Sequence, residues 1–110
     1  MPSKKNIPLP DWIEDLDNPC LSAVARDAWV ARLFALDMGA DKARRGKPLV
    51  QEGNAKLDQA RQIISVRMHP YEVREAAELL SYAHRRFVEA QHEMYEAPRA
   101  NSVWNDNDES

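Results

Sequence analysis

The chain has 110 residues, of which 15 are basic and 18 acidic, so its net charge is −3. This length is typical of one domain of roughly 100–200 residues, and the acidic balance argues against a general polyanion binder, whose surface is strongly basic. Hydrophobic residues make up 44% of the chain and glycines number only 3. These values argue against a disordered chain and against a turn-rich all-β fold.

The chain has a single cysteine, Cys20, so it cannot form an intrachain disulfide. Small secreted domains usually depend on disulfides, so we expect a reducing compartment, the cytoplasm. A free cysteine usually behaves as a small hydrophobe, so we expect Cys20 to be buried or inert. No apolar run approaches the ~18 residues of a membrane span, and the first residues lack the apolar region of a secretory signal. We therefore expect no membrane segment.

The first 18 residues are predicted to form an extended arm, because two prolines favour extended geometry in the residues before them. Within the arm, Asp11 is expected to cap one short turn that carries Trp12, Ile13 and Leu16 among acidic residues. Two interpretations stay open. The arm folds back over the helices, or its large apolar side chains bind a partner protein, at whose interfaces tryptophan is a frequent hot spot.

A helix is predicted over residues 19–38, with Asn18 as its N-cap and Gly39 as its stop. One broad apolar face consists of Leu21, Val24, Ala25, Ala28, Trp29, Ala35 and Leu36. A second stripe consists of Val30, Phe34 and Met38. A helix that is apolar on two sides is buried on two sides. It is therefore either the central helix of the domain or a helix shared with a partner, and Phe34 is a candidate partner-binding residue.

Residues 40–48 are predicted to form a further helical turn or a loop, which Gly46 and Pro48 end. A second main helix follows, beginning at residue 49 or, with Asn54 as its N-cap, at residue 55. It is expected to end at residue 68, because proline at position 70 disfavours helical geometry in the residue before it.

The middle of the chain is basic, since residues 41–69 hold 7 basic and 3 acidic residues and the flanking segments are acidic. The basic cluster consists of Lys42, Arg44, Arg45 and Lys47. It is interpreted as a solvated surface, as a docking site for an acidic protein patch, or as a nucleic-acid contact on phosphates. The cluster is extended only as a broken stripe by Lys56, Arg61 and Arg67. No aromatic residue lies among these basic residues, so nothing is available to stack on the bases of a single-stranded nucleic acid. Nucleic-acid binding is thus the less favoured interpretation.

The last helix is predicted over residues 70–97, with an apolar pattern of three-four spacing. Pro98 is expected to end it, and residues 98–110 to form an acidic tail. At ~1.5 Å per residue, this helix is long for a domain of this size and is expected to project or to pair with another chain. A homodimer through the first and last main helices fits this pattern.

Three polar or aromatic side chains of the last helix are candidate contact residues. His84 and Gln91 fall on its apolar stripe. They are either hydrogen-bonded polar side chains of the core or a polar layer in a helix–helix interface, where such residues set the register. Tyr82 lies on the opposite side, either as an outer contact for a partner or as an aromatic packed under the arm or left exposed.

No pattern in the chain predicts catalysis, a metal site or a cofactor. The histidines lack the i,i+4 spacing of a zinc pair, and no glycine-rich phosphate loop is present. The serines lack the elbow motif of a nucleophile. We therefore expect a protein without enzymatic activity.

The sequence predicts an all-α protein, a small bundle of three main helices of which the last is long. We expect a protein–protein interaction module, an inhibitor or adaptor. The alternative is a nucleic-acid-binding or regulatory protein that uses residues 42–47. In composition alone, the chain resembles small acidic helical proteins common among bacterial accessory, antitoxin-like and phage- or plasmid-encoded inhibitor proteins.

Overall fold

The computed structural model describes residues 8–65 and 67–103, with side chains as far as residue 95. Its elements are α1 (Asp11–Glu14), α2 (Pro19–Asp37), the short 3-10 helix η2 (Ala40–Lys42), α3 (Gly46–Ile63) and α4 (Pro70–Val103). The predicted all-α class, with three main helices and a long last one, is confirmed. In these described ranges, no helix has both the length and the apolar character needed to cross a membrane.

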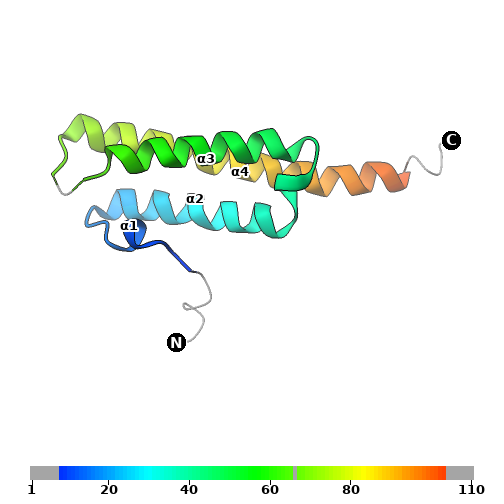
Figure 1. Ribbon diagram of the computed structural model, residues 1–110, viewed down its shortest axis with the longest axis horizontal. Coiled ribbons are helices and arrows are strands. Elements are labelled where there is room, and N and C mark those ends of the chain that lie inside the picture. The colour runs from blue at the N-terminus through cyan, green and yellow to red at the C-terminus, as the bar shows by residue number, and fades with distance from the viewer. Residues whose placement is uncertain (1–7, 66, 104–110) are drawn as a thin grey trace.

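Helix α4 is the centre of the bundle (Figure 1). It packs along both α2 and α3, whereas α2 and α3 hardly touch each other. The two interpretations of the first main helix were a central helix or one shared with a partner, and the first is wrong because α4 holds that place. On the outer side of α2, Phe34 is 57% exposed whereas Val30 and Met38 are half-buried, so the described residues cover the second apolar stripe only in part.

The core is built from small and large side chains that alternate along the helices. The buried positions of α3 are Gly46, Val50, Gly53, Leu57 and Ala60, and those of α4 are Ala76, Leu80, Ala83, Phe87 and Ala90. In both helices the steps alternate between four and three residues, which is the spacing of a coiled-coil seam. The glycines allow close approach, since a Cβ built at Gly53 would lie 2.6 Å from Cε1 of Phe87.

Helix α2 buries a similar face, with a charged residue beside it that bears on function. Its buried residues are Leu21, Ala25, Ala28, Ala31 and Ala35. Arg32 follows Ala31 and is half-buried, and it is hydrogen-bonded to Asn54 of α3. A charged side chain is therefore partly covered next to the apolar face of α2.

The ends of α2 confirm the predicted capping residues. The side-chain oxygen of Asn18 accepts hydrogen bonds from the backbone N–H of Cys20 and Leu21, at 2.9 and 3.0 Å. Gly39 follows the helix with a φ of 82°, a left-handed conformation that glycine adopts without strain. Cys20 is exposed, so the expectation of a buried cysteine is wrong, because this first turn faces solvent.

The predicted limits of the second main helix are wrong at both ends. Gly46 begins α3 rather than ending the preceding turn. Pro48 falls in the first turn, where a missing N–H leaves no hydrogen bond unmade within the helix. Asn54 consequently lies in mid-helix and caps nothing. The helix ends at Ile63 rather than at residue 68, because Ile64 adopts an extended conformation with ψ 126°.

The N-terminal arm adopts one of its two expected arrangements, whereas the last helix is longer than expected. The arm folds back on the bundle, with Ile13 completely buried and the backbone oxygen of Pro8 accepting a hydrogen bond from Nε1 of Trp29 at 2.9 Å. Helix α4 continues through Pro98 to Val103, so its predicted end at residue 97 is wrong. A proline removes one backbone hydrogen bond from a helix, and a helix of 34 residues keeps the others. The rest of the arm and tail, residues 1–7 and 104–110, lies outside the described residues.

The length of α4 makes the molecule elongated. Its radius of gyration is 16.7 Å, whereas a compact domain of this size has about 13 Å. The last turns of α4 extend past η2, beyond the ends of α2 and α3 (Figure 1).

Candidate functional site

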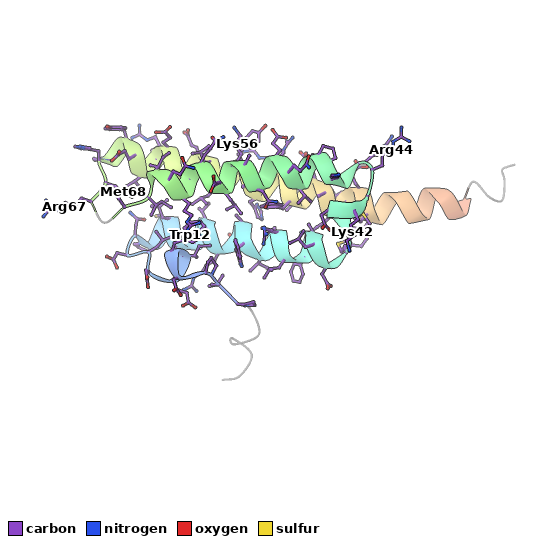
Figure 2. All side chains as sticks on the ribbon, in the orientation of Figure 1. Trp12, Lys42, Arg44, Lys56, Arg67 and Met68 are labelled. Atoms are coloured by element: carbon purple, nitrogen blue, oxygen red, sulfur yellow. The ribbon has the colours of Figure 1, made fainter. Side chains whose placement is uncertain are left out.

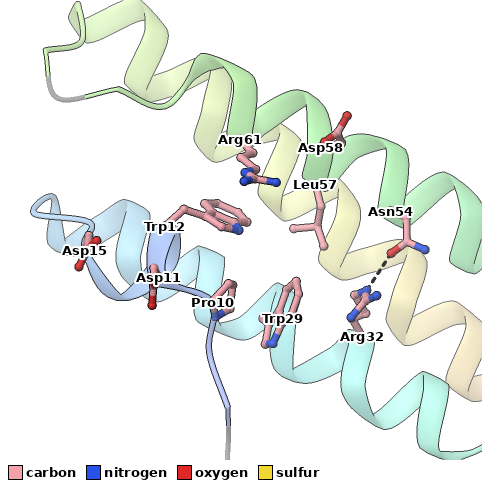
Figure 3. Close-up of a pocket in the computed structure, with 10 residues that line it drawn as sticks. All are labelled: Pro10, Asp11, Trp12, Asp15, Trp29, Arg32, Asn54, Leu57, Asp58 and Arg61. Carbon is pink, nitrogen blue, oxygen red and sulfur yellow. Dashed lines mark hydrogen bonds between the residues drawn. The ribbon is translucent and has the colours of Figure 1, made fainter.

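A groove lies between α2 and α3, next to α1 (Figure 3). It exists because both helices pack on α4 and leave the space between them open, and α1 fills only part of that space. Its volume is about 690 Å³, within the ~300–1,000 Å³ of typical ligand pockets. The lining residues are Pro10, Asp11, Trp12, Asp15, Trp29, Arg32, Asn54, Leu57, Asp58 and Arg61.

Two tryptophans give the groove its apolar surface. Trp12 comes from α1 and Trp29 from α2, and both are half-buried. Figure 3 shows Leu57 of α3 pointing into the space beside the two indoles. The hydrogen bond from Trp29 to the oxygen of Pro8 ties the α2 indole to the arm. The walls are therefore large, apolar and held in place by neighbouring elements.

Arg32 lies in the groove against one of these indoles. Its guanidinium carbon is 4.7 Å from the centre of the Trp29 ring, a favourable cation–π contact. Its Nε donates a hydrogen bond to Oδ1 of Asn54 at 2.9 Å. Burial lowers the pKa of Arg32 from its ordinary value. Among the described residues, no carboxylate forms an ion pair with Arg32, so this desolvation is offset only by a neutral amide and a ring face.

A second guanidinium lies across the groove, on α3. Arg61 is exposed, and Figure 3 shows it above the Trp12 ring. Three carboxylates also line the groove, those of Asp11, Asp15 and Asp58, and Asp58 accepts a hydrogen bond from Gln62 at 3.0 Å. The groove therefore presents charges of both signs beside apolar surface.

The side chains of the groove offer groups for binding. The lining residues include no histidine, cysteine or serine. Over the part of the chain that the structure describes, no three metal-ligating side chains gather. Indole faces accept apolar groups, and guanidiniums accept carboxylates through paired hydrogen bonds.

Two of the three apolar side chains of the arm line cavities, and the third does not. Trp12 forms a wall of the groove and also borders a smaller cavity of about 400 Å³ at the end of the bundle, which Leu16 lines as well. Ile13 points into the core with no exposed surface, so its assignment as a partner-binding residue is wrong for this structure. Phe34 is exposed on α2, away from the groove lining.

Two of the three candidate residues of the last helix form hydrogen bonds within the chain. Tyr82 is half-buried against α3, and its hydroxyl donates a hydrogen bond to Oε2 of Glu52 at 2.8 Å. It is therefore neither packed under the arm nor free as an outer contact. Gln91 donates from Nε2 to the backbone oxygen of Ala31 at 2.9 Å, which matches the hydrogen-bonded core interpretation. His84 is half-buried, and its role in an interface layer stays a prediction.

The basic side chains do not form one surface. The basic cluster is exposed at all of its members, Lys42, Arg44, Arg45 and Lys47. Arg45 forms an ion pair with Glu93, with 3.5 Å between Nη1 and Oε1. Figure 2 shows Arg44 and Arg67 at opposite ends of the bundle, and Lys56 lies over the Tyr82 ring at 5.2 Å. The continuous stripe that would follow a phosphate backbone is therefore absent from the described residues.

Of the ten residues that line the groove, the sequence indicated only Trp12 as a binding residue. Trp29 was placed on the core face, although its position three residues before Arg32 puts both on one side of a helix. Asn54 was considered only as a cap, and Arg61 only as part of a broken basic stripe. No local pattern indicates the contact between Arg32 and Asn54, because 22 residues separate them.

No protein-family model, curated protein or solved structure matches this chain. Function is therefore inferred from the groove itself. Its two indoles and two guanidiniums define what it can bind.

Proposed function

We propose that this chain is a non-enzymatic protein-binding module. Its groove between α2 and α3 takes up a segment of a partner protein that carries apolar and acidic side chains. The observation that carries the proposal is Arg32, a half-buried cation in the groove beside the apolar face of α2, which has no acidic partner among the described residues. Removing a charge from water is costly unless an opposite charge compensates for it. An acidic group of the partner supplies that compensation.

The residue types of the groove support the same function. Tryptophan and arginine are the residues most enriched among binding hot spots, and they act best in partly enclosed, desolvated positions. Trp12, Trp29 and Arg32 are all half-buried before any partner binds, so little side-chain freedom is lost on binding. As an adaptor or inhibitor, the module acts by occupying a surface of its partner. The cytoplasm is the compartment that suits a chain whose single cysteine forms no disulfide.

A peptide-display selection against the whole chain tests this function. Peptides enriched from a random library are expected to bind the unaltered chain and to lose affinity when the groove is changed. Replacing a hot-spot tryptophan costs about 2 kcal/mol or more, which is roughly 30-fold in affinity. The Trp29→Ala change is therefore expected to weaken binding at least 30-fold.

Two further variants keep this test interpretable. Arg61→Ala alters an exposed side chain of the groove and leaves the core untouched, so its effect on binding is independent of folding. Phe34→Ala removes an exposed aromatic of α2 that does not line the groove, and it is expected to leave binding unchanged. Circular dichroism shows whether each variant keeps its helices. Peptides whose binding ignores both Trp29→Ala and Arg61→Ala, or a selection that enriches none, would contradict the proposal.

A further inference from the structure

Two positions of α3, seven residues apart, mark where the guanidiniums of the groove are attached or hydrogen-bonded. Arg32 is hydrogen-bonded to Asn54 and therefore lies level with that position of α3. Arg61 is seven residues further along the same helix. At 1.5 Å per residue, the two positions are about 10 Å apart along the helix axis. Leu57 lies between them and faces the same groove.

We propose that the occupant of the groove is an amphipathic α-helix of the partner with two acidic residues seven positions apart. An apolar residue stands between them, three or four positions after the first acid. Residues at i, i+3 or i+4 and i+7 share one face of a helix. One acid then meets Arg32, the other meets Arg61, and the apolar side chain packs between the indoles of Trp12 and Trp29. This inference rests on the proposed function and specifies its partner.

The spacing favours a helix over an extended peptide. A strand rises about 3.3 Å per residue and shows every second side chain on one face. Its same-face side chains are thus about 7 or 13 Å apart, whereas positions 54 and 61 of α3 are about 10 Å apart along the helix axis. A helix meets this distance on one face with a single heptad.

The shape of the bundle also suits a helix. Helices α2 and α3 flank the groove on the side where they leave each other uncovered (Figure 3). A further helix laid between them would complete an arrangement of four packed helices, a common way to bury such a seam. Helix α1 and Trp12 already cover one end, so the partner helix contacts them with its terminal turn.

Designed helical peptides labelled with fluorescein provide the test, with fluorescence anisotropy as the measurement. The first peptide carries Glu at i and i+7 with Leu at i+3 and i+4. The second has the same composition, but its second Glu is moved to i+5, off the shared face. The third carries Gln in place of both acids. The first is expected to bind at least tenfold more tightly than the other two and to lose affinity as salt is raised.

A charge exchange makes the test specific to the groove. Arg61→Glu reverses an exposed charge and leaves the core unchanged. It is expected to weaken binding of the first peptide at least tenfold and to favour a peptide in which one Glu is replaced by Lys. Because the acid–apolar–acid pattern reads the same in both directions, the result does not depend on the orientation of the peptide.

The outcomes separate this inference from the proposed function. Equal affinity for the first and second peptides, or no effect of Arg61→Glu, overturns the heptad spacing. If display-selected peptides still depend on Trp29, the binding function stands without the helical partner. If no selected peptide depends on the groove, both proposals fail.

Discussion

Replacing Gly53 with Ala tests how closely α3 and α4 approach. The Cβ of alanine would lie 2.6 Å from Cε1 and 2.7 Å from Cζ of Phe87. Carbon atoms in ordinary contact are about 3.5–4.0 Å apart, so the ring must move by roughly 1 Å. Phe87 has no exposed surface, and the motion therefore has to displace other core side chains.

Two opposing effects set the expected magnitude. Alanine stabilises a helix interior by up to about 1 kcal/mol relative to glycine. Overpacking a core typically costs about 1–3 kcal/mol. We expect Gly53→Ala to lower the free energy of unfolding by about 1 kcal/mol. The clash costs about 2 kcal/mol, and the gain in helix propensity offsets about half of that cost. The Ala55→Gly change, at an exposed position of the same helix, measures the propensity effect alone.

Urea unfolding followed by circular dichroism gives both values. The clash energy is the loss in Gly53→Ala added to the loss in Ala55→Gly. Adding Phe87→Leu to the Gly53→Ala chain removes the ring, so the double variant is expected to lose less stability than the two single changes combined. If Gly53→Ala stabilises the chain by as much as Ala55→Gly destabilises it, the close packing of α3 against α4 is refuted.

Three smaller predictions follow from the contacts of single side chains. Gln91→Leu keeps a side chain of similar shape but removes the hydrogen bond to the backbone oxygen of Ala31. It should lower the free energy of unfolding, measured in urea, by about 0.5–1.5 kcal/mol. Unchanged stability would show that this hydrogen bond contributes nothing. The hydrogen bond to Glu52, then its negative charge, raises the pKa of Tyr82. Because the pKa of Tyr82 is higher in the folded chain than in the unfolded chain, its contacts stabilise the fold at pH values below the unfolded-state pKa of about 10. This stabilisation is lost as the pH rises further. The stability advantage of the unaltered chain over Tyr82→Phe should therefore shrink above about pH 10, and a constant difference across that range would contradict this. Cys20 is exposed and should react with a thiol reagent, one equivalent per chain, without denaturant, whereas a need for urea would place it inside the fold.

The sequence predicted those parts of the fold that depend on local chemistry. Asn18 caps α2 and Gly39 follows its end, because each needs only its immediate neighbours to act. The start and end of α3 were predicted wrongly, because Gly46 and Pro48 are compatible with both a turn and a first helical turn. The packing against α4 decides between these two possibilities, and it involves residues distant in the sequence.

The groove was predicted only in part for a related reason. Trp12 stood out as a large apolar residue among acidic ones, and it lines the groove. Ile13, its neighbour, was assigned the same role but points into the core, since consecutive residues of a helical turn face different sides. The contact of Arg32 with Asn54 joins two helices that are neighbours only because both rest on α4. Such a contact leaves no periodic pattern in the chain.

The central position of α4 has a consequence for how the protein is made. Synthesis delivers the chain from its N-terminus, so α2 and α3 leave the ribosome before the helix against which both bury their apolar faces. Until residues 70–90 emerge, these two helices have little surface to share with each other, and helices in proteins gain most of their stability from such packing. The bundle therefore forms in one late step, and a pause in translation before α4 leaves a nascent chain open to chaperones and proteases.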